Sequence, residues 1–499
     1  MKRFFTKHKN TLFVSALTLL SFLLGMFLLG QKDLSLDEIA TALIVQDWNR
    51  MLHIVTFTEN NMWLYYLLLH FWQAFGTSEF ALRSLSVIFA TLSIPVIYLL
   101  GRKVFSNKVA LLAILLIVVN VFFISNAQNA RAYALVLLLT TLSSYFFVQF
   151  VNGFSETKKI SKKYLFLLVL CNVLSVYAHL YALFVIASQA VSLLFIHKKQ
   201  VIKSLLISLP ITGVFLLPLF LAPSLSGQPT NWIPVPGIRN LIGTYLILSD
   251  DFPPIGLIYL ALFAGFFMLS FSKKSMKHVF DTSNWQRKYM IIWALLPIVL
   301  SFLFSLFIKP LYISMYFFIC LVPFMLVIAY LIDKIRLSWV KLSLVVLLLL
   351  LSSIRLYGWY SASSDLHLVI SNNTEDWKGV ATFLTTQTRS TDAILFFPPF
   401  VQENVDYYIN KDHMPLDTNR EINLQPDIYA GGTGYEQFDS KKLQSIPVHY
   451  SRLWYISGMY TDNAISDQEK QINTMLKNNY TLARTVPFYA ITAYLYVRK

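Results

Sequence analysis

The chain has 499 residues, of which 56% are hydrophobic and only 13% are charged. Soluble domains carry about 25% charged residues, so this composition excludes an ordinary soluble protein and indicates a membrane protein. The formal net charge of +15 does not indicate nucleic-acid binding, because the basic residues form short clusters between long apolar runs, as membrane topology requires. Cys171 and Cys320 both lie in apolar runs and predict neither a disulfide framework nor a thiolate metal site.

The apolar runs predict a polytopic α-helical membrane protein. The first run, residues 11–30, follows a basic N-terminus and is too long for the apolar core of a signal peptide, so we expect a retained span. A span needs about 20 apolar residues, and about eleven runs are candidates: residues 11–30, 84–101, 109–125, 132–152, 164–178, 180–196, 204–222, 253–272, 289–308, 312–332 and 338–357.

The basic clusters predict the orientation of these spans. If the N-terminus is cytoplasmic, every second connection is basic, and Lys273, Lys274 and Lys277 mark one of these inside connections. The run 164–196 has lysine clusters at both ends, so we expect a hairpin that turns near residues 177–180. The last span, 338–357, is the weakest because Arg355 interrupts it. If that span did not cross, the C-terminal domain would be cytoplasmic; we favour the extracytoplasmic side.

Two connections on the predicted outer face are long. The first, residues 31–83, contains amphipathic pieces around 37–47 and 62–75. The second, residues 223–252, is rich in Pro and Gly and predicts an ordered loop or lid. We therefore expect a transmembrane domain over residues 1–360 that carries both outer loops.

From residue 361 to residue 499 the composition is that of a soluble domain. The periodicity predicts helices at 375–387, 402–409 and 467–476, strands at 392–397 and 451–457, and a strand or hairpin at 487–497. This alternation predicts a small α/β domain.

Few charged residues lie at the predicted outer ends of the spans, where charge is costly and often functional. Asp37 and Glu38 follow the first span, and their alternative role is to stabilise the N-terminus of a helix behind Ser35. Arg131 and Lys309 are the basic candidates; the alternative for both is a snorkelling side chain.

Other polar residues are weaker candidates. His179 lies at the predicted hairpin tip, where an interfacial packing role is the simpler interpretation. Asp250 and Asp251 are two adjacent acids without other spaced metal ligands, which is weak support for a cation site. No Walker motif, Cys/His metal spacing or Gly-x-Ser-x-Gly turn occurs, so nothing supports nucleotide-driven transport.

Several of these residues belong to an ordered set of segments. The set comprises the Asp37–Glu38 pair, then residues 61–70 (NMWLYYLLLH), 80–85 (FALRSL), 98–105 (YLLGRKVF), 127–135 (AQNARAYAL) and 177–181 (YAHLY). Together they resemble the bacterial GT-C glycosyltransferases related to protein O-mannosyltransferases and the aminoarabinose lipid A transferase. The start of the C-terminal domain resembles the same enzymes.

The resemblance implies an inverting transfer of a sugar from a polyprenyl-phosphate lipid to an acceptor hydroxyl outside the cytoplasmic (inner) membrane. Asp37 falls on the family's catalytic aspartate and would take the acceptor proton. Arg131 and Lys309 would meet the donor phosphate. The substrate would be lined by the remaining candidates: Glu38, Tyr65, Asn129, Tyr133, His179 and Tyr312. The acceptor stays open among lipid, protein and polysaccharide, and the sugar stays open as well.

The chain also departs from the family pattern. Many relatives carry an acid where this chain has Asn129, so a divalent metal is a doubtful cofactor. Two alternatives remain: a flippase or transporter of lipid-linked glycans, and a catalytically inactive protein that binds them. Asn129 favours the inactive binder. The gathering of polar residues at the outer span ends, without a charged path through the spans, disfavours the flippase.

Overall fold

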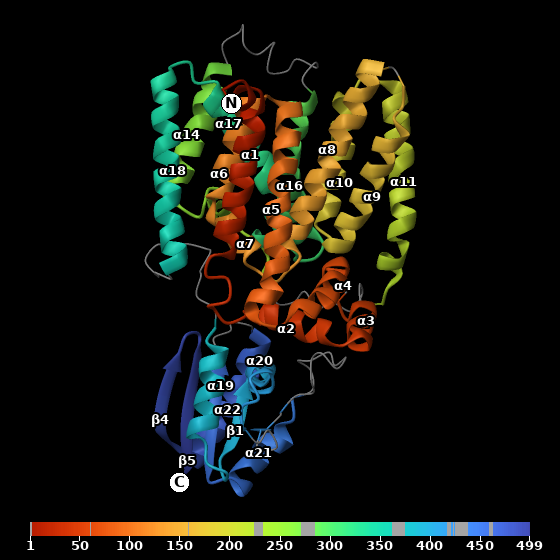
Figure 1. Ribbon diagram of the computed structural model, residues 1–499. Helices are drawn as coiled ribbons and strands as arrows, with labels where there is room; N and C mark the ends of the chain where they lie inside the picture. The colour runs from red at the N-terminus through yellow and green to blue at the C-terminus, as the bar shows by residue number, and fades with distance from the viewer. Residues whose placement is uncertain are drawn as a thin grey trace. The chain divides into compact units, whose positions relative to one another are not determined.

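The computed structural model divides into two compact units (Figure 1). The bundle unit comprises Met1–Leu29 and Asn60–Asn372, and the C-terminal unit comprises Gly30–Glu59 and Asn373–Lys499. The later boundary between the units falls between Asn372 and Asn373, and residues 30–59, expected in a loop of the transmembrane domain, belong to the C-terminal unit. The structure describes residues 2–59, 61–157, 159–223, 233–270, 285–361, 375–416, 421–422, 424, 438–458 and 463–499.

The bundle unit is helical. Its α-helices are α1 (Lys2–Met26), α4 (Trp63–Trp72), α5 (Glu79–Val104), α6 (Asn107–Val118), α7 (Val121–Ala127), α8 (Tyr133–Thr157), α9 (Lys162–Ala178), α10 (Ala182–Ser192), α11 (Lys199–Leu221), α13 (Ile238–Leu248), α14 (Pro253–Ser270), α16 (Trp285–Phe307), α17 (Leu321–Asp333) and α18 (Ser338–Ser361). Three 3₁₀ segments join them: η1 (Gln73–Phe75), η2 (Leu193–Phe195) and η4 (Ser314–Cys320). The predicted loop 223–252 therefore contains a helix, α13; its residues 224–232 lie outside the described ranges.

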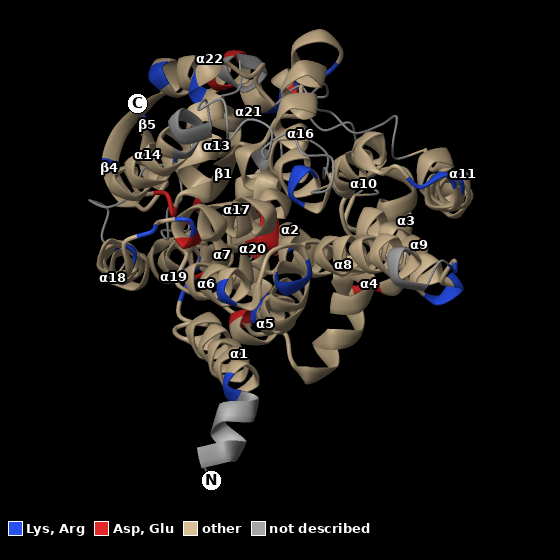
Figure 2. Cartoon of the chain, turned by 90° about the horizontal axis from the view of Figure 1, so that it is seen from above, with Lys and Arg blue, Asp and Glu red and all other residues tan. Residues whose placement is uncertain are grey.

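The chain is a multi-span membrane protein. Among the described residues, seven helices are long and apolar enough to cross a membrane, and nine if each of two bent pairs counts as one span. The predicted spans 164–178 and 180–196 form the shorter helices α9 and α10, with the expected turn between Ala178 and Ala182. Lysines lie at the starts of α9 and α11, where Figure 2 shows blue segments, and the rest of these two helices is nearly free of charge. Lys273, Lys274 and Lys277 lie outside the described residues.

Buried polar side chains join three helices of the bundle unit. Asn172 on α9 donates to Gln189 on α10 over 3.1 Å, and Gln189 donates to Ser143 on α8 over 2.7 Å. Ser143 in turn donates to Asn172, which closes a ring of hydrogen bonds. Because apolar surfaces gain little by associating in lipid, such interhelical hydrogen bonds help to fix helix packing.

Helix α18 is held to the bundle by a buried ion pair. Arg355 Nη2 lies 3.1 Å from Asp251 Oδ2, and both side chains are fully buried. Asp250 accepts a hydrogen bond from the backbone N–H of Val121, at the start of α7. The Asp250–Asp251 pair thus has a cationic partner within the chain, the guanidinium of Arg355. The arginine that weakened the sequence prediction for this span is a packing residue of a helix that continues to Ser361.

The C-terminal unit is an α/β fold, as predicted. Its described strands are β1 (Ala393–Phe397), β2 (Glu421–Ile422), β3 (Arg452–Gly458), β4 (Tyr480–Phe488) and β5 (Ile491–Arg498), in the order β2-β1-β3-β5-β4. β2, β1 and β3 are parallel, and β5 and β4 continue the sheet antiparallel. The helices are α2 (Leu36–Gln46), α3 (Trp48–Phe57), α19 (Trp377–Gln387), α20 (Pro399–Lys411), α21 (Ser440–His449) and α22 (Asn463–Asn479).

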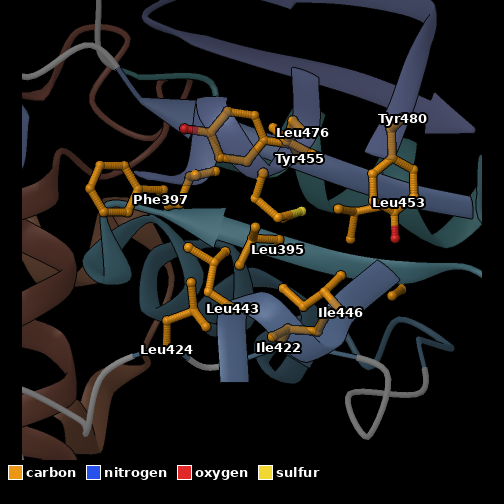
Figure 3. Packing of buried hydrophobic residues seen from close by; sticks show 13 residues of the cluster. Leu395, Phe397, Ile422, Leu424, Leu443, Ile446, Leu453, Tyr455, Leu476 and Tyr480 are labelled. Atoms are coloured by element: carbon orange, nitrogen blue, oxygen red, sulfur yellow. The ribbon is translucent and has the colours of Figure 1, made fainter. Parts of the chain in front are cut away.

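The core of this unit lies between the sheet and helices α21 and α22. Leu395 of β1 and Leu453 of β3 pack with Leu443 and Ile446 of α21 and with Leu476 of α22 (Figure 3). The continuous apolar run of β1 and the alternation of β5 located these strands in the sequence, and the run at 451–457 located β3. The sequence pattern missed the first part of β4, since most side chains of that strand are exposed and give no alternating pattern.

Candidate functional site

Asp37 and Glu38 occupy the first turn of α2 in the C-terminal unit. Glu38 Oε2 accepts hydrogen bonds from the Ser35 backbone N–H over 2.9 Å and from the Ser35 hydroxyl over 3.2 Å. This is the reciprocal capping arrangement that stabilises a helix start. Glu38 therefore performs the capping role weighed for the pair, and the side chain of Asp37 is exposed on the same turn.

A third acid, Glu375, converges on this helix start from the segment that precedes α19. Its carboxylate accepts a hydrogen bond from the backbone N–H of Leu36 and feels the charges of Asp37 and Glu38. Burial, supported by these two negative charges, raises the pKa of Glu375 above its ordinary value, although its backbone hydrogen bonds oppose the shift. The sequence did not single out Glu375 as a site residue, because more than 300 residues separate it from Asp37.

In the bundle unit, His179 lies at the centre of an aromatic cluster. Its ring centroid is 4.6 Å from that of Tyr316, 5.5 Å from that of Tyr181 and 6.1 Å from that of Tyr133. Asn61 holds the turn after α9, because its Oδ1 accepts from the Leu180 N–H over 3.1 Å and its Nδ2 lies 3.4 Å from His179 Nε2. We call His179, Tyr133, Tyr181 and Tyr316 the aromatic cluster.

The surroundings of His179 favour a neutral imidazole. Burial first, and the positive charge of Arg131 second, lower the pKa of His179 to about 3. Consistent with a neutral ring, Nδ1 accepts a hydrogen bond from the Tyr181 backbone N–H over 3.2 Å. His179 therefore offers a hydrogen-bonding ring without charge, and the positive charge beside the aromatic cluster is that of Arg131.

Tyr65 and Ser86 support the segment that carries Arg131. The Tyr65 hydroxyl on α4 lies 2.8 Å from the Ser86 hydroxyl on α5, and Ser86 donates to the Arg131 carbonyl over 3.2 Å. Tyr65, which the sequence predicted as a substrate residue, is fully buried, and its hydroxyl takes part in this series of hydrogen bonds. Tyr65 acts on the backbone of the arginine segment.

Tyr312 and Lys309 follow α16. The Tyr312 hydroxyl lies 2.7 Å from the Thr244 hydroxyl of α13, which also donates to Ser314 over 3.0 Å. The Tyr312 ring contacts Phe317, and Phe317 contacts Tyr181 of the aromatic cluster. Lys309 is exposed just after α16, and its backbone N–H bonds to the carbonyl of Phe304.

Asn129 precedes Arg131 by two residues on the same segment. Its carbonyl accepts from the Arg131 N–H over 2.8 Å, and its buried Oδ1 has no hydrogen-bond partner among the described residues. Within the same described ranges, no three His, Cys, Asp or Glu side chains are grouped so that they could hold a metal ion.

Comparison with known proteins identifies the fold of this chain. Residues 61–225 match the family model of dolichyl-phosphate-mannose-protein mannosyltransferases. No curated protein sequence matches the chain. The apo structure of ArnT from Cupriavidus metallidurans superposes with a TM-score of 0.56 at 12% identity and covers 98% of each chain. The chain has the GT-C fold.

Two further structures support this fold assignment. ArnT from Cupriavidus metallidurans bound to undecaprenyl phosphate matches with a TM-score of 0.54 at 11% identity, over 97% of both chains. The oligosaccharyltransferase AglB from Archaeoglobus fulgidus, in complex with an inhibitory peptide and a dolichol-phosphate, has the same TM-score and identity. That match covers 98% of this chain and 74% of AglB. The GT-C fold predicted from the ordered motifs is confirmed.

The sequence located Tyr133, His179 and Arg131, which the structure brings together. It missed the roles of Asn61, Ser86 and Tyr316. Asn61 begins the segment 61–70, but a polar side chain that fixes a turn has no spacing signature. Tyr316 lies far outside all of the quoted segments. Ser86 is a small hydroxyl within an apolar span, where the simplest expectation is a hydrogen bond to the helix backbone.

Proposed function

We propose that the chain is an inverting membrane glycosyltransferase that moves a sugar from a polyprenyl-phosphate donor to an acceptor hydroxyl. The observation that carries this proposal is the aromatic cluster with Arg131 beside it. Apart from Tyr316, these residues lie within residues 61–225, which match the mannosyltransferase model. Two of the similar structures contain a polyprenyl phosphate, undecaprenyl phosphate in ArnT and dolichol-phosphate in AglB, which supports a lipid-phosphate donor.

The side chains of this site suit both the sugar and the phosphate of such a donor. Aromatic faces pack well on the apolar faces of sugar rings, and tyrosine hydroxyls and a neutral imidazole supply hydrogen bonds without a competing charge. The arginine guanidinium is the side chain that recognises phosphate oxygens most specifically. We assign Arg131 to the donor phosphate, with Lys309 as a second cation, and Tyr133, His179 and Tyr312 to the sugar side.

Asp37 is the proposed general base. It takes the proton of the acceptor hydroxyl while the hydroxyl oxygen attacks the anomeric carbon, and the bond from that carbon to the phosphate oxygen breaks. The electron pair leaves with the polyprenyl phosphate, whose growing negative charge the basic side chains stabilise. The basic clusters support an extracytoplasmic location for this step in the cytoplasmic (inner) membrane.

The test compares wild type with Asp37→Asn, in lipid vesicles that contain a panel of polyprenyl-phosphate sugars with water and simple alcohols as acceptors. We expect Asp37→Asn to lower lipid-phosphate release, followed by mass spectrometry, by about 10²- to 10⁴-fold, the usual contribution of a general base. The protein should stay folded, since Glu38 and Ser35 provide the cap.

Asp47→Asn is the matched control. Asp47 is another exposed acid of the same segment and caps α3 by accepting from the Arg50 N–H over 2.7 Å, and asparagine caps a helix equally well. Equal release by wild type and Asp37→Asn would contradict the assignment of the base. Saturable donor binding without release in wild type would favour the inactive binder.

A further inference from the structure

The segment that leads into Asp37 is anchored to the C-terminal part of the chain. Residues 30–59 form one compact unit with residues 373–499. This unit includes α2 and α3, whose red-orange colour in Figure 1 marks them as segments near the beginning of the chain. The residues immediately before Asp37 therefore depend on partners encoded several hundred residues later.

Three hydrogen bonds make this anchor. The Leu34 backbone N–H donates to the Tyr408 hydroxyl over 2.8 Å, and the Lys378 backbone N–H donates to Asp33 Oδ2 over 2.9 Å. The Leu36 backbone N–H donates to the carboxylate of Glu375. We call Glu375, Lys378 and Tyr408 the anchor residues.

The anchor lies at the first turn of α2, where the backbone N–H groups have no hydrogen-bond acceptor within the helix. The first N–H groups of a helix have no acceptor within that helix, and Leu36 is the first residue of α2. Glu375 supplies the missing acceptor at Leu36, next to Asp37. Tyr408 is fully buried, so the position of its hydroxyl is fixed by the packing of α20.

We propose that the anchor residues are positioning residues for Asp37, so that the C-terminal unit holds the general base in its reactive orientation. This inference rests on the proposed function. Because a small displacement of a catalytic group lowers the rate strongly, loss of an anchor hydrogen bond should reduce turnover more than donor binding.

Tyr408→Phe tests the anchor, because it removes one hydroxyl and keeps the buried ring. Tyr480→Phe is the matched control: its hydroxyl donates to the Tyr450 carbonyl over 2.8 Å in the same unit, away from residues 33–38. Glu375→Gln and Glu375→Ala form a second pair, since glutamine keeps an acceptor for Leu36 and alanine does not.

Two readouts are measured on the full-length protein in lipid vesicles. The first is kcat and KM for lipid-phosphate release from the best donor of the panel. The second is hydrogen–deuterium exchange at the amides of residues 34–41. We expect Tyr408→Phe and Glu375→Ala to lower kcat by about 10-fold with little change in KM, and to accelerate exchange at these amides. Glu375→Gln should retain most of both properties, and Tyr480→Phe should change neither.

Unchanged kcat and exchange in Tyr408→Phe and Glu375→Ala would overturn the proposal. Equal losses in Tyr408→Phe and Tyr480→Phe would also overturn it, because a general loss of stability would then explain the result. Faster exchange with unchanged kcat would show an anchor without a positioning role. If wild type releases no lipid phosphate from any donor, the proposed function fails, and the exchange data decide separately whether the anchor exists.

Discussion

At the scale of single residues, Asp392 shows how one carboxylate joins three segments of the C-terminal unit. It lies just before β1 and accepts from Arg452 Nε over 2.7 Å, from Trp454 Nε1 over 3.1 Å and from the Arg389 N–H over 3.1 Å. Burial by itself would raise the pKa of Asp392, but these hydrogen bonds and the charge of Arg452 outweigh it and hold the pKa below its ordinary value.

We expect Asp392→Asn to destabilise the sheet at neutral pH by about 2–3 kcal/mol, the usual contribution of hydrogen bonds to a charged group. Because the pKa is lower in the folded state, the ionised carboxylate stabilises the fold above its unfolded pKa of about 3.9. This contribution is lost as the pH falls through the lower folded pKa. Hydrogen–deuterium exchange at β1 and β3 amides, measured at pH 7 and at the lowest pH the protein tolerates, checks this.

Asp467→Asn serves as the control for Asp392→Asn. Asp467 pairs with Lys470 three residues later, and both side chains are about three-quarters exposed. Exposed pairs of this kind contribute little, so exchange at β1 and β3 should not change. If the two variants behaved alike, the network around Asp392 would not stabilise the sheet.

At the scale of elements, the position of α18 depends on polar contacts near its C-terminal end. Besides the Arg355–Asp251 pair, Trp359 Nε1 donates to Gln128 Oε1 over 2.9 Å, and Gln128 Nε2 donates to the Phe27 carbonyl over 2.8 Å. These contacts link the last helix of the bundle unit to the end of α1 and to the segment before Arg131. A helix that exposes most of its apolar surface thus gains a defined position through a few buried polar groups.

Arg355→Met should lower the stability of the bundle unit by about 3–5 kcal/mol, because it leaves Asp251 as a buried charge without its cation. Thermal unfolding of the full-length protein in lipid measures the loss. Adding Asp251→Asn should restore most of it, since asparagine is neutral and tolerates the left-handed backbone at this position, where φ is 50°. A single variant as stable as wild type would contradict this role of the ion pair.

The helices were predictable where the signal is local, and the exceptions have physical causes. Charge clusters at both ends of 164–196 required an even number of crossings, and this located the turn at His179. By contrast, residues 312–332 begin with the 3₁₀ segment η4 before α17 starts at Leu321. The hydroxyls of Thr244 and Ser314 hold this segment, and apolar periodicity carries no information about such a contact.

At the scale of the whole molecule, the sequence predicted the GT-C fold and the α/β class of the C-terminal domain, both from patterns within contiguous segments. It placed residues 31–83 in one outer loop, whereas the structure divides this loop between the two units at residue 60. The bonds responsible join Leu34 to Tyr408 and Asp33 to Lys378. Hydrophobic periodicity carries no information about contacts between residues so far apart in the sequence. The surroundings of Asp37 could therefore be predicted only in part.

A chain that ends at Ser361 should keep its bundle unit but lose order in residues 30–59. Its α2 would lack the anchor residues and the packing against α20, and α3 packs on α2. We expect limited proteolysis and hydrogen–deuterium exchange to find residues 30–59 accessible in this truncated chain and protected in the full-length protein. The amides of α8, which carries Ser143 of the interhelical ring, provide the internal reference. Equal protection of residues 30–59 in both chains would show that this segment folds without the C-terminal residues.

The discontinuous make-up of the C-terminal unit also bears on how the protein is synthesised. In the folded protein 374 residues separate Leu34 from its partner Tyr408. During synthesis, the helices between these residues are made and inserted first. In that interval α2 and α3 lack the residues that complete their fold, and their apolar faces remain accessible to other partners. The proposed general base would thus reach its working position only after nearly the whole chain has been translated. A polypeptide stalled before α20 would carry Asp37 in an inactive form.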